Sequence, residues 1–320
     1  MSEGRIRALR PGDRIGLIGP SGAIRDPAMT PRALAARVEA LGFEPVLGQS
    51  VGAAHGYLSG SDALRLDDLH RMFADDSIGA VHCVRGGYGT PRLLDRIDYA
   101  LLRAHPKPLI GFSDVTGLHL AIHAQCGFPT LHGPMVSSDA LVDPFSRAEL
   151  LRALLCPNPS GTLPLPPGEP APACLCPGVA EGTLIGGNLS LIAALCGTRF
   201  LPDMRGKVLF IEEIREYTYA VDRMLTHLRL AGVFDACAAV VFGGFTRCEP
   251  EYPNFGLTLE QVLAETVAPC GKPAITGLLC GHRCPTLTLP LGVRCRVDAD
   301  RGTLTVLESI YDYKQRGTIV

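Results

Sequence analysis

The chain has 320 residues, enough for two domains or one large domain, and its 47% hydrophobic and 19% charged residues are typical of a soluble globular protein. A formal net charge of −2, with acidic and basic residues interspersed, excludes an electrostatic surface for nucleic acid or for an anionic membrane. No apolar stretch reaches the ~20 residues that span a bilayer, and Arg and Asp interrupt the N-terminal segment where a signal peptide needs an apolar core, so we expect a cytoplasmic protein.

The first half of the chain alternates short β-branched runs with segments of helical periodicity. We expect strands at residues 14–22, 43–49, 78–87 and 108–112, and helices at 31–43, 61–75, 90–105 and 114–127. Ser61 or Asp62 is a suitable N-cap for the second helix. This alternation predicts an α/β fold in which a mostly parallel, flavodoxin-like sheet has helices on both faces.

Residues 156–180 are rich in proline, so neither a helix nor a central strand can run through them. We interpret this segment as a linker between an N-terminal domain, residues 1–155, and a C-terminal domain, residues 181–320. The second domain is predicted to be a smaller α/β domain with a β-rich end. Its expected elements are a strand, turn and helix at 183–198, a strand at 207–214, a helix at 219–232, a strand at 238–245 and a hairpin within 285–309.

Three loops of the first half follow predicted strands: GPSG at 19–22, RGGYG at 85–89 and GFSD at 111–114. In parallel sheets ligands bind beyond the carboxyl ends of the strands. The three loops therefore predict one ligand site at this edge of the sheet.

Ser113 lies at the sharp junction between the strand at 108–112 and the following helix. One interpretation is an N-cap, whose hydroxyl accepts a hydrogen bond from a backbone N–H one turn into the helix. The other is a nucleophile, because Gly111 permits a tight turn and the backbone N–H of Asp114 at the helix N-terminus can stabilise an oxyanion. The full G-x-S-x-G pattern of α/β-hydrolases is not present, so the junction alone leaves both interpretations open.

A nucleophilic serine needs a base, and the base needs an orienting acid. His119 and His123 lie on the helix after Ser113, where packing or surface roles are expected, and His132 can line the site. His282 follows Gly281 in an irregular loop and is the better base.

For the acid, the apolar strand KVLFIEEI ends in Glu212 and Glu213. Strand alternation puts these two side chains on opposite faces, so only one can enter the site. A strand end that meets solvent is the alternative interpretation.

The motifs GFSD, IEE followed by YAVDRML, and GH within PAITGLLCGHRCPTLTLPLG resemble the LD-carboxypeptidases, serine peptidases that include the microcin-C immunity peptidases. The resemblance runs nearly from end to end. It implies a catalytic triad of Ser113, Glu212 and His282 on two domains, and an oxyanion hole from the backbone amides of Asp114 and Gly87. It also implies a cytoplasmic homodimer that uses no metal or cofactor.

Two departures from the family pattern bear on these assignments. Many members have Asn where this chain has Thr286, which puts any bond made by that Asn in doubt. The acid region reads EEIREYTY, which keeps Glu213 and Glu216 as alternative acids.

The resemblance implies hydrolysis of the amide between an L-centre and a terminal D-amino acid, such as the D-Ala of a muropeptide tetrapeptide in cell-wall recycling. We expect Arg85, with Gly86 and Tyr88 beside it, to bind this small peptide, because a guanidinium can clamp its free carboxylate. An ion pair of Arg85 with Asp95 or Asp98 is the structural alternative. The alternative substrate is a microcin-C-type aminoacyl or peptidyl nucleotide-like toxin, which the lack of any Trp for base stacking disfavours.

Two interpretations come from other classes of protein. Most of the 12 cysteines lie in apolar runs and are interpreted as buried residues. Five residues could still form a zinc site, although their spacing is not that of a C-x₂-C knuckle: Cys174, Cys176, Cys280, His282 and Cys284. The chain could also be a non-catalytic protein that binds an anion at GPSG and RGGYG.

Overall fold

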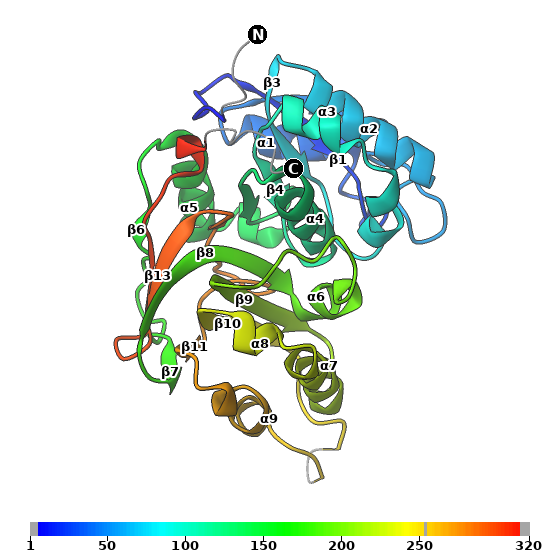
Figure 1. Ribbon diagram of the computed structural model, residues 1–320. Coiled ribbons are helices and arrows are strands. Elements are labelled where there is room, and N and C mark those ends of the chain that lie inside the picture. The colour runs from blue at the N-terminus through cyan, green and yellow to red at the C-terminus, as the bar shows by residue number, and fades with distance from the viewer. Residues whose placement is uncertain (1–5, 253–254, 314–320) are drawn as a thin grey trace.

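The computed structural model describes residues 6–252 and 255–313. Figure 1 shows the first sheet and its helices, mostly blue to green, above the second sheet, which is mostly green to red-orange. Residues 1–5 and 314–320, the outermost ends of the two predicted domains, lie outside the described residues. Residues 1–5 also begin the N-terminal segment that was compared above with a signal peptide. No helix in the described part of the chain is long and apolar enough to cross a membrane.

The first sheet has six strands in the order β12-β5-β4-β3-β1-β2. All neighbouring pairs from β1 to β5 are parallel, and β12 is antiparallel to β5. The order 2-1-3-4-5 of the parallel strands is that of the flavodoxin-like sheet, as predicted. The strands are β1 (Arg14–Ile18), β2 (Glu44–Leu47), β3 (Ile78–Cys83), β4 (Leu109–Gly111), β5 (Thr130–His132) and β12 (Leu289–Leu291).

Helices cover both faces of this sheet. Alternate strand residues such as Ile18 and Val81 pack against α2 (Asp62–Ala74), α3 (Tyr99–Ala104) and α4 (Thr116–Cys126). Their neighbours, such as Leu17 and Ala80, face α1 (Pro31–Glu39) and α5 (Pro144–Leu155). Burying each such Ile, Val or Leu side chain contributes ~1.5–3 kcal/mol, so the alternating pattern decides which face each helix covers.

The structure decides one helical prediction in this half and corrects another. Ser61, rather than Asp62, caps α2 by accepting a hydrogen bond from the amide of Leu64. The continuous helix predicted at 90–105 is wrong: the segment forms η1 (Thr90–Arg92), η2 (Leu94–Arg96) and then α3. Asp98 caps α3 by accepting from the amide of Leu101, so a new helix starts there.

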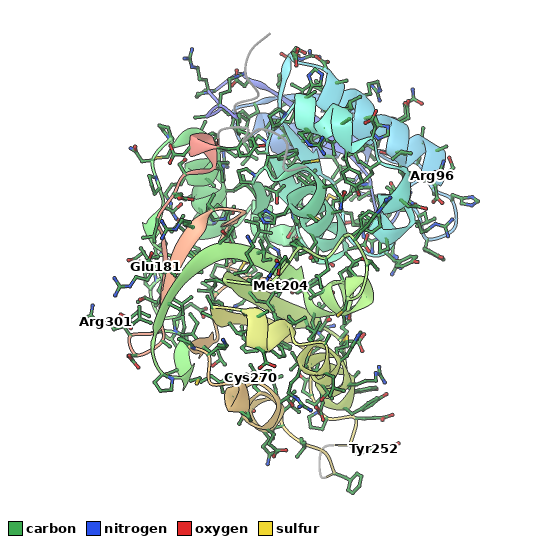
Figure 2. The ribbon with its side chains drawn as sticks, in the orientation of Figure 1. Arg96, Glu181, Met204, Tyr252, Cys270 and Arg301 are labelled. Carbon is green, nitrogen blue, oxygen red and sulfur yellow. The ribbon has the colours of Figure 1, made fainter. Side chains whose placement is uncertain are left out.

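The second sheet has eight strands in the order β6-β14-β13-β8-β9-β10-β11-β7. Its centre, from β8 to β11, is parallel, and the outer strands are antiparallel. The predicted hairpin is β13 (Arg294–Asp298) with β14 (Thr303–Val306), and Arg301 projects from its turn (Figure 2). The other strands are β6 (Gly161–Thr162), β7 (Ala173–Cys176), β8 (Val179–Asn188), β9 (Lys207–Ile214), β10 (Ala239–Thr246) and β11 (Ala274–Thr276).

Four helices cover one face of this second sheet. They are α6 (Leu189–Leu195), α7 (Thr218–Leu230), α8 (Val233–Ala236) and α9 (Leu259–Thr266). Leu209 and Ile211 of β9 face them, whereas Val208 and Phe210 lie on the opposite face, where the Phe210 ring meets His132 of the first half. Tyr252 projects from the end farthest from the first sheet (Figure 2).

The proline-rich segment 156–180 does more than link two domains. It supplies β6 and β7, which are the two outermost strands of the second sheet. Proline is tolerated at such edges because one side of an edge strand has no ladder hydrogen bonds to lose. No helix and no central strand lies within residues 156–178, but the central strand β8 begins at Val179, inside the predicted segment. The segment therefore contributes strands to the second sheet and is more than a linker.

The chain also returns to the first half near its end. β12 pairs with β5, with Leu289 opposite His132. The Tyr311 hydroxyl, in η6 (Ile310–Asp312), donates to the carbonyl oxygens of Ala153 and Leu154 at the end of α5, near which the red segment lies in Figure 1. Segments far apart in sequence therefore join the two halves.

Candidate active site

Ser113 lies on a strained turn between β4 and α4. Phe112 is extended, with φ of −152°, and Ser113 has a φ of 63°, which is uncommon for a residue with a side chain. A Cβ atom at Gly111 would lie 2.9 Å from Cγ1 of Val115, so the turn needs glycine there. Ser113 makes no capping hydrogen bond, and the N-cap interpretation is wrong. Such a strained serine between strand and helix has the geometry of a nucleophile elbow.

The glycine pair of the 85–89 loop lies directly against this serine. A Cβ atom at Gly86 would be 2.9 Å from Cβ and 3.1 Å from Oγ of Ser113. The Gly86 carbonyl accepts a hydrogen bond of 3.0 Å from the amide of Gly22, and Gly87 has a φ of 111°. Backbone therefore approaches the hydroxyl here without an intervening side chain.

Asp114 has a buried side chain that faces away from solvent. Its Oδ2 accepts a hydrogen bond of 2.8 Å from the amide of Thr90, and its carbonyl accepts from the Thr90 hydroxyl. Burial raises the pKa of this carboxyl above its usual range. The side chain thus connects the start of α4 to the end of the 85–89 loop. The backbone amide of Asp114 directly follows Ser113, in the first turn after the strand.

Glu212 and His282 form a hydrogen-bonded pair across 70 positions of sequence. Nδ1 of His282 donates to Oε2 of Glu212 over 2.6 Å, the carboxylate is fully buried, and the imidazole is 15% exposed. A Cβ atom at Gly281 would lie 2.8 Å from Oε2 of Glu212, so glycine is required before the histidine. Because Nδ1 carries the proton, Nε2 of His282 is left as a proton acceptor.

Glu213 points the other way, as strand alternation predicts. Its Oε1 accepts from Nδ2 of Asn188 and the amide of Ile214, and its Oε2 accepts from the amide and the hydroxyl of Ser190, over 2.6–2.8 Å. These bonds anchor the start of α6. The idea of a strand end that meets solvent is wrong, since both carboxylates are buried. Glu216 is half-buried, and burial, with the nearby charge of Glu213, raises its pKa.

Contacts between the halves bring these groups together. The Phe112 ring meets the His282 ring edge-on at a centroid distance of 4.8 Å. The hydroxyl of Thr116 on α4 accepts a hydrogen bond of 2.9 Å from the amide of Asn188 at the end of β8. In Figure 1 the start of α4 lies close to β8 and β9, at the level where the two sheets meet. Ser113 therefore lies beside a residue that packs on His282.

Burial lowers the pKa of three other histidines, two on α4 and one beside the site. His119 donates from Nε2 to the Gly111 carbonyl over 2.9 Å, and burial lowers its pKa to about 4. Burial also lowers the pKa of His123 to about 4. His132 is buried between Phe112 and Phe210, at ring centroid distances of 5.9 and 5.0 Å, and burial holds its pKa well below the usual value. The expectation that His132 lines the site is consistent with its contact with Phe112.

Arg85 and Tyr88 border the glycine pair. The Arg85 guanidinium donates to the Ala23 carbonyl, and within residues 6–252 and 255–313 it forms no ion pair, so the alternative pairing with Asp95 or Asp98 is wrong. Burial, and then the charge of Arg25, lower its pKa. Tyr88 is 48% exposed, and its ring lies 5.8 Å from that of Tyr57.

The proposed zinc ligands do not gather. Cys174 and Cys176 lie on the edge strand β7, and Cys280 is buried with a thiol pKa raised by burial. In the described ranges no three His, Cys, Asp or Glu side chains are arranged to hold a metal ion, so the zinc interpretation is wrong.

Thr286, the departure from the family pattern, is buried in the same loop. Its amide donates to the Ser146 hydroxyl over 2.8 Å, which connects the His282 loop to α5.

Sequence reasoning missed Phe112 and the steric requirement for Gly281. The order Gly-His was visible in the sequence, but only the position of the Glu212 carboxylate shows why no larger residue fits there. Phe112 directly precedes Ser113, and no pattern in the neighbouring sequence predicts that its ring contacts His282.

Comparison with known families identifies the chain. Residues 15–133 match the LD-carboxypeptidase N-terminal domain, and residues 181–297 match the LD-carboxypeptidase C-terminal domain. The chain belongs to the LD-carboxypeptidase family. It is therefore a peptidase, and the interpretation as a non-catalytic binding protein is wrong.

Relatives of this LD-carboxypeptidase cover nearly its whole length. The probable murein peptide carboxypeptidase of Bacillus subtilis (strain 168) is 40% identical over 303 residues, which are 94% of this chain and 93% of that protein. The structure of MccF in complex with glutamyl sulfamoyl guanosine has a TM-score of 0.85 at 26% identity and covers 97% of this chain and 100% of that one. Muramoyltetrapeptide carboxypeptidase from Oxalobacter formigenes has a TM-score of 0.79 at 27% identity, covering 92% and 97%. The predicted family and fold class are confirmed.

Proposed function

We propose that this LD-carboxypeptidase is a serine peptidase that removes a terminal D-amino acid through Ser113, His282 and Glu212. The observation that carries the proposal is the 2.6 Å bond from Nδ1 of His282 to Glu212, which leaves Nε2 as the base. Phe112 packs on that imidazole, and the serine that follows it has the strained φ of a nucleophile elbow.

The reaction proceeds in two acyl-transfer steps. Ser113 Oγ attacks the carbonyl carbon of the amide, and Nε2 of His282 takes the hydroxyl proton. The amides of Gly87 and Asp114 stabilise the oxyanion, and Glu212 stabilises the imidazolium. His282 then donates its proton to the leaving amine of the D-amino acid. In the second step water, deprotonated by His282, hydrolyses the ester on Ser113.

The substrate we propose is a muropeptide tetrapeptide that loses D-Ala. The names of the relatives support this choice, since two of those described above are murein or muramoyltetrapeptide carboxypeptidases. Arg85 lies beside the glycine pair without a carboxylate partner of its own in the described part of the chain, so it can clamp the free carboxylate of the substrate. Gly86 and Tyr88, the neighbours of Arg85 in the 85–89 loop, would contact the substrate beside that carboxylate.

The structural likeness to MccF favours one second candidate, an aminoacyl nucleotide. A nucleobase site gains from an aromatic platform, and this chain has no Trp. We therefore rank the aminoacyl nucleotide second.

The deciding experiment measures D-Ala release from a muropeptide tetrapeptide by the wild-type protein and by Ser113→Ala, with EDTA present. We expect release by the wild type alone. Wild-type cleavage of aminoacyl sulfamoyl-adenosine without D-Ala release would replace the first substrate by the second. Activity retained by Ser113→Ala would overturn the nucleophile.

The cytoplasmic location and the homodimer remain predictions from sequence. Cell fractionation tests the first of them, and light scattering of the purified protein tests the second.

A further inference from the structure

Arg65 is a fully buried arginine that the catalytic assignment does not use. It lies in the first turn of α2, and its side chain is 0% exposed. A buried guanidinium is costly unless its charge is paired and its N–H groups are bonded. Its bonding partners therefore indicate what keeps it there.

Those partners lie on the two loops that follow β1 and β3. Nη1 of Arg65 donates to the Pro20 carbonyl and, over 3.0 Å, to the Gly89 carbonyl. Nη2 donates to Oδ1 of Asp62 over 2.6 Å. One planar group thus bridges the 19–22 loop, the 85–89 loop and the helix between them.

Asp62 holds the guanidinium in place from the solvent side. It also accepts hydrogen bonds of 2.8–3.1 Å from Arg92. The bond from Arg92, and then that from Arg65, lower the pKa of Asp62 to about 2, so the carboxylate stays ionised at neutral pH. The positive charge of Arg65 is therefore paired.

One of the two bridged loops, 85–89, lies against Ser113, and the other, 19–22, is bonded to it. The amide of Gly22 donates to the Gly86 carbonyl over 3.0 Å, and Gly86 lies against the serine side chain. A Cβ atom at Gly89 would lie 2.5 Å from Nη1 of Arg65, so glycine at this position leaves room for the guanidinium. A shift of Arg65 would move the Gly89 carbonyl and, through it, the backbone of Gly86 and Gly87.

We propose that Arg65 is a positioning residue, which fixes the spacing of the 19–22 and 85–89 loops and so holds the Gly86–Gly87 backbone at the distance from Ser113 that acyl transfer requires. This inference rests on the proposed function. Lysine cannot replace the guanidinium of Arg65. Its single ammonium on a flexible stem lacks the planar, divergent N–H donors that bond to two carbonyls and a carboxylate. Misplacing catalytic groups by about 1 Å can cost ~10²-fold in rate.

The test compares Arg65→Lys and Arg65→Met with Arg32→Lys, the same kind of change at an exposed position of α1. Three quantities are measured: kcat and KM for D-Ala release, the rate at which a fluorophosphonate labels Ser113 per folded molecule, and Tm. For Arg65→Lys we expect kcat and the labelling rate to fall ~10–100-fold while KM changes by less than about threefold. Arg32→Lys should match the wild type in all three.

Each result supports or overturns the role inferred for Arg65. Wild-type kcat and labelling in folded Arg65→Lys would overturn the inference, as would a loss fully explained by a smaller folded fraction. If Arg65→Met does not fold, Arg65→Lys alone decides, because it keeps the charge and nearly the length of the side chain. A wild-type protein that is neither labelled at Ser113 nor active would instead refute the proposed function.

Discussion

The two halves of the molecule hold their parts of the candidate site by different means. In the first half the geometry is backbone geometry: Ser113 has a φ of 63°, and Gly86 leaves no room for a Cβ atom. In the second half it is a side-chain pair, in which buried Glu212 binds His282 over 2.6 Å. The first half should therefore be sensitive to added volume, and the second to the loss of a charge.

The polar groups buried in the two halves also differ. The first half buries histidines, among them His82 and His119, as well as carboxylates such as Asp114, whereas the described part of the second half buries the carboxylates Glu212 and Glu213 and no histidine. A buried neutral base and a buried carboxylate respond differently to pH. The effects of low pH and of single substitutions on stability and activity can therefore distinguish the two halves.

The largest effect is expected for Glu212→Gln, which tests the side-chain pair. The substitution keeps the shape but removes the charge that fixes the imidazole tautomer, and kcat should fall ~10³–10⁴-fold. The measurement is kcat for D-Ala release with Tm determined in parallel. A loss below about tenfold would show that Glu212 is not the triad acid.

Gly86→Ala tests the backbone side of the comparison. The added methyl group would lie 2.9 Å from Cβ of Ser113, so either the loop or the serine must move, and kcat/KM should fall ~10²-fold. The control is Gly79→Ala in β3, where the nearest atom would be 3.5 Å away, and it should keep full activity. Equal activity of the two variants would mean that the site does not depend on this close approach.

Acid should destabilise the protein through the buried histidines of the first half. Burial lowers the pKa of His82 and of His119 from 6.5 to about 4. Between these two pH values the unfolded chain binds more protons, so stability falls as the pH drops from 6.5 toward 4. The loss from pH 7 to pH 5 is about 2 kcal/mol for each histidine.

Denaturant unfolding at several pH values measures this acid dependence. His82→Gln should reduce the slope of stability against pH between 4 and 6.5, even though the variant is less stable at pH 7. His227→Gln, on the exposed surface of α7, should keep the wild-type slope. An unchanged slope in His82→Gln would show that this histidine titrates normally in the folded state.

The smallest effect is expected for Glu213→Gln, the counterpart of the first substitution. Gln would turn an amide NH₂ toward donors that now face a carboxylate, and the free energy of unfolding should fall by about 1–3 kcal/mol. Activity per folded molecule should fall by less than about tenfold. A loss of kcat as large as that of Glu212→Gln, with unchanged stability, would give Glu213 the role of the acid.

Much of the architecture followed from local sequence. Alternation with a period of two predicted β9 and placed Glu212 and Glu213 on opposite faces, and helical periodicity predicted α1, α2 and α4. The position of Ser113 at the end of a strand was visible for the same reason. These features depend on residues within a few positions of one another, so a single sequence carries them.

Pairing across the chain was decided by the tertiary structure. The sequence does not show that β12 joins the first sheet, that residues 161–162 and 173–176 become edge strands, or that Arg65 bridges two loops. The sequence also left Glu213 and Glu216 open as alternatives to Glu212, and only the packed structure brings the Glu212 carboxylate to His282. The sequence by itself thus determined most of the central strands and helices, and the chemical groups of the site. Which groups meet depends on how strands and loops distant in sequence pack together, and local periodicity carries no information about that packing.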